Sequence, residues 1–152
     1  MFSNFFPSSF KMNHTCIGDS TQEHVYDTSE QAIMHIKACL MGDTESATAI
    51  LGMGKKPLAC KKQGRKVRPW NEELWQQSVE KIAVAVLLAK FSQNEALRAK
   101  LVNTGSSTLA EAAPHDRIWG IGLSIASAKT GQQWKGRNLL GNALMQVRNE
   151  LA

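Results

Sequence analysis

Apolar side chains follow a helical period over much of the chain and predict its longest elements. Residues 82–89 form an unbroken apolar run, typical of a helix segment that is buried on all sides. Asn71 precedes two glutamates and suits the N-cap of that helix, which we expect to run to about Phe91. A last helix is predicted from about Arg137 to Leu151. Its core positions are Leu140, Leu144, Val147 and Leu151.

The first third of the chain predicts two further helices, which are marked by their capping residues. One covers about 28–41, and its first turn carries a capping box. The second covers about 44–51 and begins after Asp43, a good N-cap. The caps of the first helix are Asp27 or Thr28, with Glu30 or Gln31 closing the box and Gly42 at the C-terminal end.

The remaining pattern predicts a hairpin and one more helix. Residues 10–17 alternate loosely between apolar and polar, and a turn at 18–20 leads to a partner strand at 22–26. A helix is expected over about 94–102, and residues 109–112 suit a short strand or a turn of helix. Lys90 is either an exposed stem or points into a pocket. The sum is four or five helices: a mainly α fold, a single compact multihelical domain over residues 1–152 with a small N-terminal β-hairpin.

Composition narrows the class of protein. At 152 residues, 43% hydrophobic and 20% charged, the chain is an ordinary globular domain, and its longest apolar run is too short to cross a bilayer. Cys16, Cys39 and Cys60 are odd in number and lack metal-binding spacing, which favours a reducing, intracellular (cytoplasmic) location. The four histidines form no HExxH pair, so we expect no metal site.

Positive charge is concentrated in one segment. The net charge is +5, yet residues 55–68 alone carry seven lysines and arginines and no acid. Such a segment attracts phosphate groups or a nucleic-acid backbone, although a solvated loop is an equally good interpretation. We expect it to be an irregular connection. The basic residues are Lys55, Lys56, Lys61, Lys62, Arg65, Lys66 and Arg68.

The helix at 28–41 carries the clearest candidate for catalysis. Glu30 and Lys37 are two turns apart less about 20°, so a carboxylate and an amine lie on one face about 10 Å apart along the axis, with Met34 between them. An acid/base and a nucleophile could face one small substrate from there. The alternative is a capping carboxylate beside an ordinary surface lysine.

Other polar positions are weaker candidates. Asn4 lies among aromatic residues and either faces a pocket or belongs to a segment whose phenylalanines fill the core. Residues 114–122 form a loop with an acid, an aromatic residue and two glycines, able to approach a ligand closely. Asn138 stands at a helix N-terminus and favours an anion or simply caps the helix. Trp70 and Trp75 bracket a helix start and are expected in the core.

Five short motifs follow one another along the chain: Phe-Ser-Asn-Phe at 2–5, Thr-Ser-Glu-Gln at 28–31 followed by Lys37, Lys-Phe at 90–91, Asp-Arg-Ile-Trp-Gly-Ile-Gly at 116–122 and Gly-Arg-Asn-Leu-Leu-Gly at 136–141. In this order and spacing they strongly resemble the NADAR family, also called YbiA-like proteins, over nearly the whole chain. The resemblance implies a mostly helical domain that hydrolyses the N-glycosidic bond at C1 of a ribose. Residues 123–128 depart from it, since many members have a glycine-rich stretch there.

The resemblance also implies roles for single residues. Glu30 matches the family's catalytic carboxylate and Lys37 the lysine of the same helix; Asp116 and Trp119 match its Asp…Trp-Gly loop, and Asn4 its N-terminal motif. We therefore predict Glu30, Lys37 and Asp116 as catalytic residues, and no cofactor. The other predicted site residues are Ser3, Asn4, Phe5, Trp119, Gly120 and Asn138 for substrate binding, and Lys61, Lys62, Arg65 and Arg68 for phosphate.

Two substrate classes follow from the resemblance: ADP-ribose attached to guanine in DNA, and phosphorylated intermediates of riboflavin biosynthesis. Because a small metabolite needs fewer than seven positive charges, we expect ADP-ribosylated DNA as the partner and no membrane. In the expected mechanism Glu30 shuttles protons, Lys37 attacks C1 and Asp116 holds the ribose or assists Glu30. Two rivals are a non-catalytic ADP-ribose-binding module and a basic domain that only binds nucleic acid.

Overall fold

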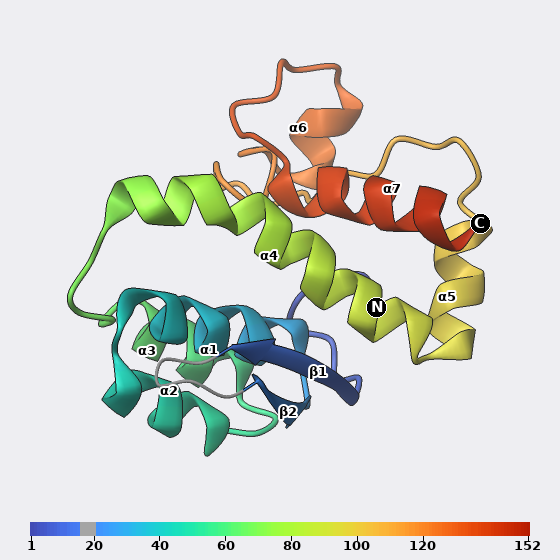
Figure 1. Ribbon diagram of the computed structural model, residues 1–152. Coiled ribbons are helices and arrows are strands. Elements are labelled where there is room, and N and C mark those ends of the chain that lie inside the picture. Colours follow the sequence, from blue (N-terminus) through green and yellow to red (C-terminus); the bar gives the residue numbers. More distant parts are fainter. Residues whose placement is uncertain (16–20) are drawn as a thin grey trace.

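One long helix, α4, runs through the middle of the molecule and divides it into two sides (Figure 1). The computed structural model describes residues 1–15 and 21–152, and every structural statement below concerns this part of the chain. Helices α1, α2 and α3 with the hairpin lie on one side of α4, and α5 and α7 pack on the other. The elements are β1 Phe10–Thr15, β2 Thr21–Tyr26, α1 Ser29–Met41, α2 Thr44–Leu51, α3 Pro57–Gly64, α4 Glu72–Ser92, α5 Glu95–Val102, α6 Ile125–Lys129 and α7 Leu139–Leu151.

The caps of α1 confirm the predicted helix start. Thr28 Oγ1 accepts a hydrogen bond from the Gln31 backbone N–H (3.1 Å), and Gln31 Oε1 accepts one from the Asp27 N–H (2.9 Å). Gln31, not Glu30, therefore closes the box, which leaves the Glu30 carboxylate available for other contacts. Gly42 ends the helix with a φ of 87°, a left-handed conformation that suits glycine.

Helix α4 begins at its predicted cap and carries both halves of the core. Asn71 Oδ1 accepts a hydrogen bond from the Leu74 N–H at 3.0 Å. Val86 packs in the apolar cluster on the α1 side, and Leu87 packs in the cluster on the α7 side. The run 82–89 is not buried all round, however, since Ala85 is exposed. In α7, Leu140, Leu144 and Val147 are buried as predicted, and Leu151 is partly buried.

The basic segment is the main error of the sequence prediction, because half of it is helical. Pro57 stands in the first turn of α3, where its missing N–H needs no partner. Cys60 is fully buried and Gly64 lies against α1, so close that a side chain there would overlap Met34 Sδ. These contacts with α1 stabilise a short helix that the apolar pattern of the sequence does not predict.

Two further stretches differ from the prediction. A short helix, α6, follows Ser124, whose Oγ accepts a hydrogen bond from the Ser127 N–H at 3.1 Å. Residues 109–112, predicted as a strand or helical turn, are irregular. The described residues thus form seven helices, more than the four or five predicted, although the mainly α class is confirmed.

The hairpin delivers the chain to α1. Strands β1 and β2 pair antiparallel with Phe10 opposite Tyr26, and both side chains are buried. The predicted turn at 18–20 lies outside the described residues, as do Cys16 and Ile17. Among the helices described, none has the length and apolar character needed to cross a membrane.

Candidate active site

The N-terminal segment lies against the start of α1. The Asn4 carbonyl oxygen accepts a hydrogen bond from the Glu30 N–H at 2.9 Å. Lys90 Nζ donates to the carbonyl oxygens of Met1 and Ser3, both at 3.2 Å, and the Lys90 side chain is fully buried. Lys90 is therefore neither an exposed stem nor a pocket residue but an anchor for this segment. Burial lowers the pKa of its amine from 10.5 to about 8.

Asn4 brings a buried polar side chain to this position. Asn4 is 7% exposed, and its Oδ1 atom is buried without a hydrogen-bond partner among the described residues. A buried carbonyl oxygen of this kind is able to accept a hydrogen bond from a bound molecule. Its neighbour Phe5 is 37% exposed, and the Ser3 hydroxyl accepts a hydrogen bond from the Phe5 N–H at 3.1 Å. Only Phe2 of the N-terminal phenylalanines packs on the core, against Phe91.

Glu30 is a buried carboxyl group whose acidity is shifted strongly. It is 8% exposed, and burial raises its pKa from 4.5 to about 7. The nearby charges of Lys61 and Lys37 oppose this rise, whereas the Asp116 carboxylate adds to it. Near neutral pH the group is present in both protonation states, as general acid/base catalysis requires.

Lys37, two turns further along α1, lies beside two neighbouring indole rings. Its Nζ atom is 4.7 Å from the ring centroid of Trp70 and 5.2 Å from that of Trp75. Burial lowers the pKa of the Lys37 amine, the charges of Glu30 and Glu72 raise it, and those of Arg65 and Arg68 lower it further. A partly buried amine beside aromatic rings has the character expected of a nucleophilic lysine.

The two tryptophans are site residues that the sequence interpretation missed. Trp75 is 8% exposed, as expected of a core residue, but Trp70 is only half-buried. Both lie beside the Lys37 amine, although Lys37 is more than thirty positions earlier in the chain. Their nearness in sequence to a basic segment was the only available signal, and it did not indicate which side chain they would contact.

The loop at 116–122 holds its own shape through Asp116. Asp116 Oδ1 accepts hydrogen bonds from the backbone N–H groups of Ile118 (3.0 Å) and Trp119 (2.8 Å). Its charge raises the pKa of Glu30, so the Asp116 carboxylate lies near enough to act on that group. Trp119 is partly buried and packs against both apolar clusters, so at least part of its ring fills core.

Gly120 and Asn138 stabilise the conformation of the same loop. A Cβ atom at Gly120 would lie 2.9 Å from the Asp116 carbonyl oxygen, so only glycine fits there. Asn138 is 1% exposed, and its amide accepts from the Glu111 N–H (3.0 Å) and donates to the Leu109 carbonyl (2.9 Å). Substrate binding by Asn138 would require these bonds to be replaced, so we leave it out of the proposed site.

The basic residues divide into two groups. Lys61 and Arg65 are near enough to Glu30 to lower its pKa, and Lys61 Nζ lies 5.8 Å from the ring centroid of Phe5. Arg68 Nη1 donates to the Val67 carbonyl oxygen at 2.6 Å. Lys62 is exposed, and within the described chain no interaction joins it to Glu30 or Lys37. Of the predicted phosphate ligands, Lys61 and Arg65 thus border the site.

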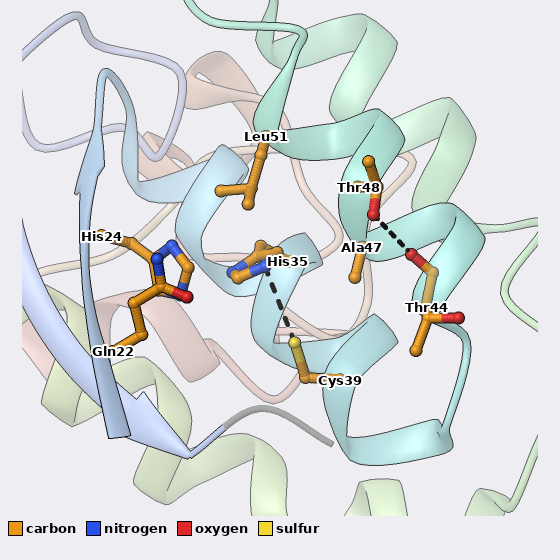
Figure 2. A pocket seen from close by; sticks show the side chains of 8 residues that line it. All are labelled: Gln22, His24, His35, Cys39, Thr44, Ala47, Thr48 and Leu51. Atoms are coloured by element: carbon orange, nitrogen blue, oxygen red, sulfur yellow. Dashed lines mark hydrogen bonds between the residues drawn. The ribbon is translucent and has the colours of Figure 1, made fainter. Parts of the chain in front are cut away.

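The opposite face of α1 lines a separate cavity of about 180 Å³, shown in Figure 2. His35 Nδ1 lies 2.7 Å from the Tyr26 hydroxyl, and its Nε2 lies 3.6 Å from Cys39 Sγ. Over the ranges 1–15 and 21–152, no three histidine, cysteine or acidic residues are arranged to hold a metal ion. The cavity residues are Gln22, His24, His35, Cys39, Thr44, Ala47, Thr48 and Leu51.

Comparison with known proteins places this chain in one family. The chain is 39% identical to the Caenorhabditis elegans protein irg-1, with 99% of this chain and 75% of that protein covered. It is 38% identical to an N-glycosidase of Acanthamoeba polyphaga mimivirus, with 99% and 86% covered. A riboflavin biosynthesis protein of Vibrio vulnificus is 27% identical, with 98% of this chain but 35% of that protein covered.

The comparison of structures agrees with the comparison of sequences. The solution structure of the Escherichia coli protein YbiA superposes with a TM-score of 0.74 at 28% identity, covering 99% of this chain and 76% of that one. The match confirms the mainly α fold with its small hairpin. The family model for the NADAR domain matches residues 1–152, and the chain therefore belongs to the NADAR family.

Proposed function

We propose that this protein is an N-glycosidase that cleaves the bond between C1 of a ribose and an exocyclic amine. The observation that carries the proposal is the shared face of α1. It presents a buried carboxyl group with a pKa of about 7 and, two turns along, an amine with a lowered pKa. The mimivirus relative, named an N-glycosidase, supports the same reaction class.

Glu30 supplies the proton that the departing amine needs. As the C1–N bond breaks, the protonated carboxyl group gives its proton to the leaving nitrogen, so that a neutral amine departs. Positive charge then develops on C1 and the ring oxygen. The carboxylate that Glu30 has become stabilises this charge electrostatically, and Asp116 adds to the negative potential at the same place.

Lys37 acts as the nucleophile in this scheme. Its neutral amine forms a bond to C1 and passes the surplus proton to the Glu30 carboxylate. Glu30 then gives this proton to the ring oxygen as the C1–O bond breaks, so that the opened sugar is held as a protonated Schiff base and Glu30 is again a carboxylate, which takes a proton from the incoming water. Water then adds to C1, and the C1–Nζ bond breaks to release the sugar. One water molecule is consumed, and Glu30 and Lys37 return to their starting states.

For the substrate we favour ADP-ribose on guanine of DNA. Lys61 and Arg65 bring positive charge to the edge of the site, where the pyrophosphate or the DNA backbone would lie. Phe5, partly exposed beside Lys61, offers a ring on which a base could stack. The second candidate is a phosphoribosylamino intermediate of riboflavin biosynthesis, favoured by the name of the Vibrio relative.

One experiment tests the reaction and separates the substrates. Purified protein is given a DNA oligonucleotide with ADP-ribosyl-guanine or, separately, a phosphoribosylamino-pyrimidine, and release of the ribose product is followed. Glu30→Gln should slow turnover by about 10²–10⁴-fold. Glu45→Gln, which changes the equivalent first-turn position of α2, should leave it unchanged.

The outcomes are distinct. Turnover of one substrate that depends on Glu30 supports the proposal and assigns the substrate. Binding of ADP-ribose without turnover in either assay, unaffected by Glu30→Gln, would instead identify a non-catalytic binding module. Binding of any DNA that weakens steeply with salt and ignores ADP-ribose would identify a nucleic-acid-binding domain.

A further inference from the structure

The indole of Trp70, which faces Lys37, is held by one hydrogen bond to the first turn of α4. Trp70 lies in irregular chain before the Asn71 cap, so no helical backbone fixes its ring. Its Nε1 atom donates to Glu72 Oε2 at 2.7 Å. The bond directs the ring whose centroid is 4.7 Å from Lys37 Nζ.

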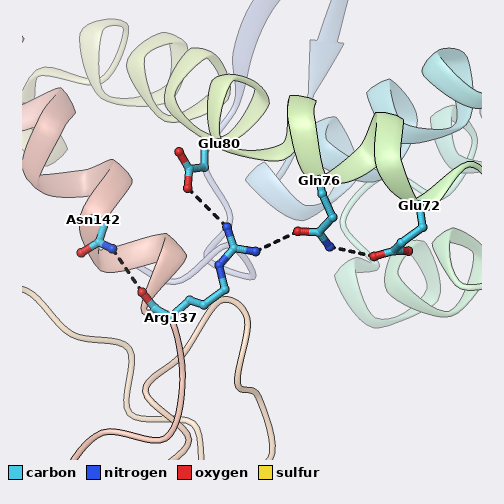
Figure 3. A network of polar contacts seen from close by, with 5 residues as sticks. All are labelled: Glu72, Gln76, Glu80, Arg137 and Asn142. Carbon is cyan, nitrogen blue, oxygen red and sulfur yellow. Dashed lines mark hydrogen bonds and ion pairs between the residues drawn. The ribbon is translucent and has the colours of Figure 1, made fainter.

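Glu72 is itself held from the other side, as Figure 3 shows. Gln76 Nε2 donates to Glu72 Oε1 at 2.7 Å, and Gln76 Oε1 accepts from Arg137 Nη1 at 3.0 Å. Arg137 Nη2 also pairs with Glu80 at 3.3 Å. Both oxygens of the Glu72 carboxylate are therefore bonded, which restricts the side chain to one orientation although it lies at the surface.

This chain of contacts starts at the loop that carries Asp116. The Arg137 backbone N–H donates to the Arg117 carbonyl oxygen at 2.8 Å, so Arg137 moves with that loop. Asp116 stands on one side of Glu30, and Trp70 stands over Lys37. The contacts through Gln76 and Glu72 join these two parts of the site.

We propose that Glu72 is a positioning residue for Lys37, which acts through the indole of Trp70 and is kept in place by Gln76 and Arg137. The proposal rests on Lys37 belonging to the active site proposed above. A ring face held over the ammonium group favours its charged form and limits its movement. A mobile ring would do neither.

The charges around Lys37 predict how its pKa changes when Glu72 is removed. Glu30 of α1 and Glu72 of α4 raise the pKa of Lys37, and Arg65 and Arg68 of the basic segment lower it, as does burial. Removing Glu72 removes a raising charge and frees the ring. Both effects increase the fraction of neutral amine.

The test measures the reactivity of Lys37 without any substrate. Full-length protein is labelled briefly with acetic anhydride at pH 8, and the extent of Lys37 acetylation is read by peptide mass spectrometry against the exposed Lys100. Glu72→Ala should raise Lys37 labelling about two- to fivefold. Glu72→Gln should raise it less, because the amide oxygen still accepts the bond from Trp70 Nε1.

Glu73→Ala is the matched control. Glu73 lies in the same first turn and bonds Gln77 four residues on, at 3.3 Å, but does not contact Trp70. Lys37 labelling in Glu73→Ala should equal Lys37 labelling in the wild type. In a Trp70→Phe background, which has no indole N–H, Glu72→Ala and Glu72→Gln should become equivalent.

Two results would overturn the proposal. If Lys37 were labelled equally in Glu72→Ala and Glu73→Ala, Glu72 would have no effect on Lys37 that the neighbouring first-turn acid lacks. Equal labelling in Glu72→Ala and Glu72→Gln with Trp70 intact would show that only charge matters. Acetylation of Lys37 does not depend on turnover. If Glu72→Ala raised Lys37 labelling but the wild-type protein cleaved no glycoside, the proposed function would be refuted and the positioning role of Glu72 would stand.

Discussion

A lysine lies beside aromatic rings at each end of α4, Lys90 of α4 itself and Lys37 of α1, and the difference between them separates a structural lysine from a candidate nucleophile. At the C-terminal end, Lys90 is fully buried, with its Nζ 5.3 Å from the ring centroid of Phe91, and it donates to two backbone carbonyl oxygens. At the N-terminal end, Lys37 meets indole faces and the charge of Glu30. A lowered pKa is common to both, so hydrogen bonding and charge partners distinguish the two roles.

The largest expected difference is in turnover. Lys37→Met should reduce it on the order of 10³-fold or more, because the nucleophile is lost, while the folded state changes little. Lys90→Met, the same substitution at the other end of α4, should leave most activity. Steady-state turnover of the two variants checks this, and an active Lys37→Met variant would refute the covalent route. Borohydride should trap a sugar on the wild type but not on Lys37→Met.

The second prediction concerns the stability cost of the site. Because the pKa of Glu30 is about 7 in the folded protein and 4.5 in the unfolded chain, the folded protein binds more protons between these values. The free energy of unfolding therefore falls as pH rises from 4.5 to 7, by about 3 kcal/mol in total. Urea unfolding should find Glu30→Gln more stable than the wild type by up to this amount at pH 8, and nearly equal to it at pH 4.

At the other end of α4, a change should destabilise the protein. Lys90→Met leaves the carbonyl oxygens of Met1 and Ser3 without their donor, which should lower the free energy of unfolding by about 1–3 kcal/mol. Urea unfolding measures the loss. Lys100→Met, a change at an exposed position in α5, is the control; equal stabilities would mean that the N-terminal segment does not need this anchor.

The smallest effect distinguishes two neighbouring lysines of α3. Lys61→Ala removes the largest influence that lowers the pKa of Glu30. The alkaline limb of the pH–rate profile, where Glu30 loses the proton that it donates, should therefore move to higher pH, and KM for a phosphate-bearing substrate should rise a few-fold. Lys62→Ala changes an exposed lysine without that influence. Its profile should overlay that of the wild type, and identical behaviour of the two variants would remove α3 from the site.

Local chemistry in the sequence predicted most of the fold on both sides of α4. The caps at Thr28, Asp43 and Asn71 are contacts between residues three positions apart, so a reader of the sequence can find them. Helix α3 could not be found in this way. Several of its residues favour a helix, but its eight residues show no apolar period, and its stability depends on the burial of Cys60 and Gly64 against another part of the chain.

The same distinction holds for the site. The spacing of Glu30 and Lys37 on one helix predicted a shared face, and the charge of each acts on the pKa of the other. The approach of Trp70 to Lys37, and of Asp116 to Glu30, depends on how helices and loops distant in sequence pack together. The strong shift in the acidity of Glu30 comes from that packing as well, because burial is its largest cause.

The close contact at Gly64 gives one small residue an influence over the chemistry. A methyl group there would overlap Met34 Sδ, so the Met34 side chain fills the space between α1 and α3 at this position. Gly64→Ala would displace that side chain, which lies along α1 between Glu30 and Lys37. A change in α3 would thus reach the surroundings of both groups, although the added carbon would touch neither.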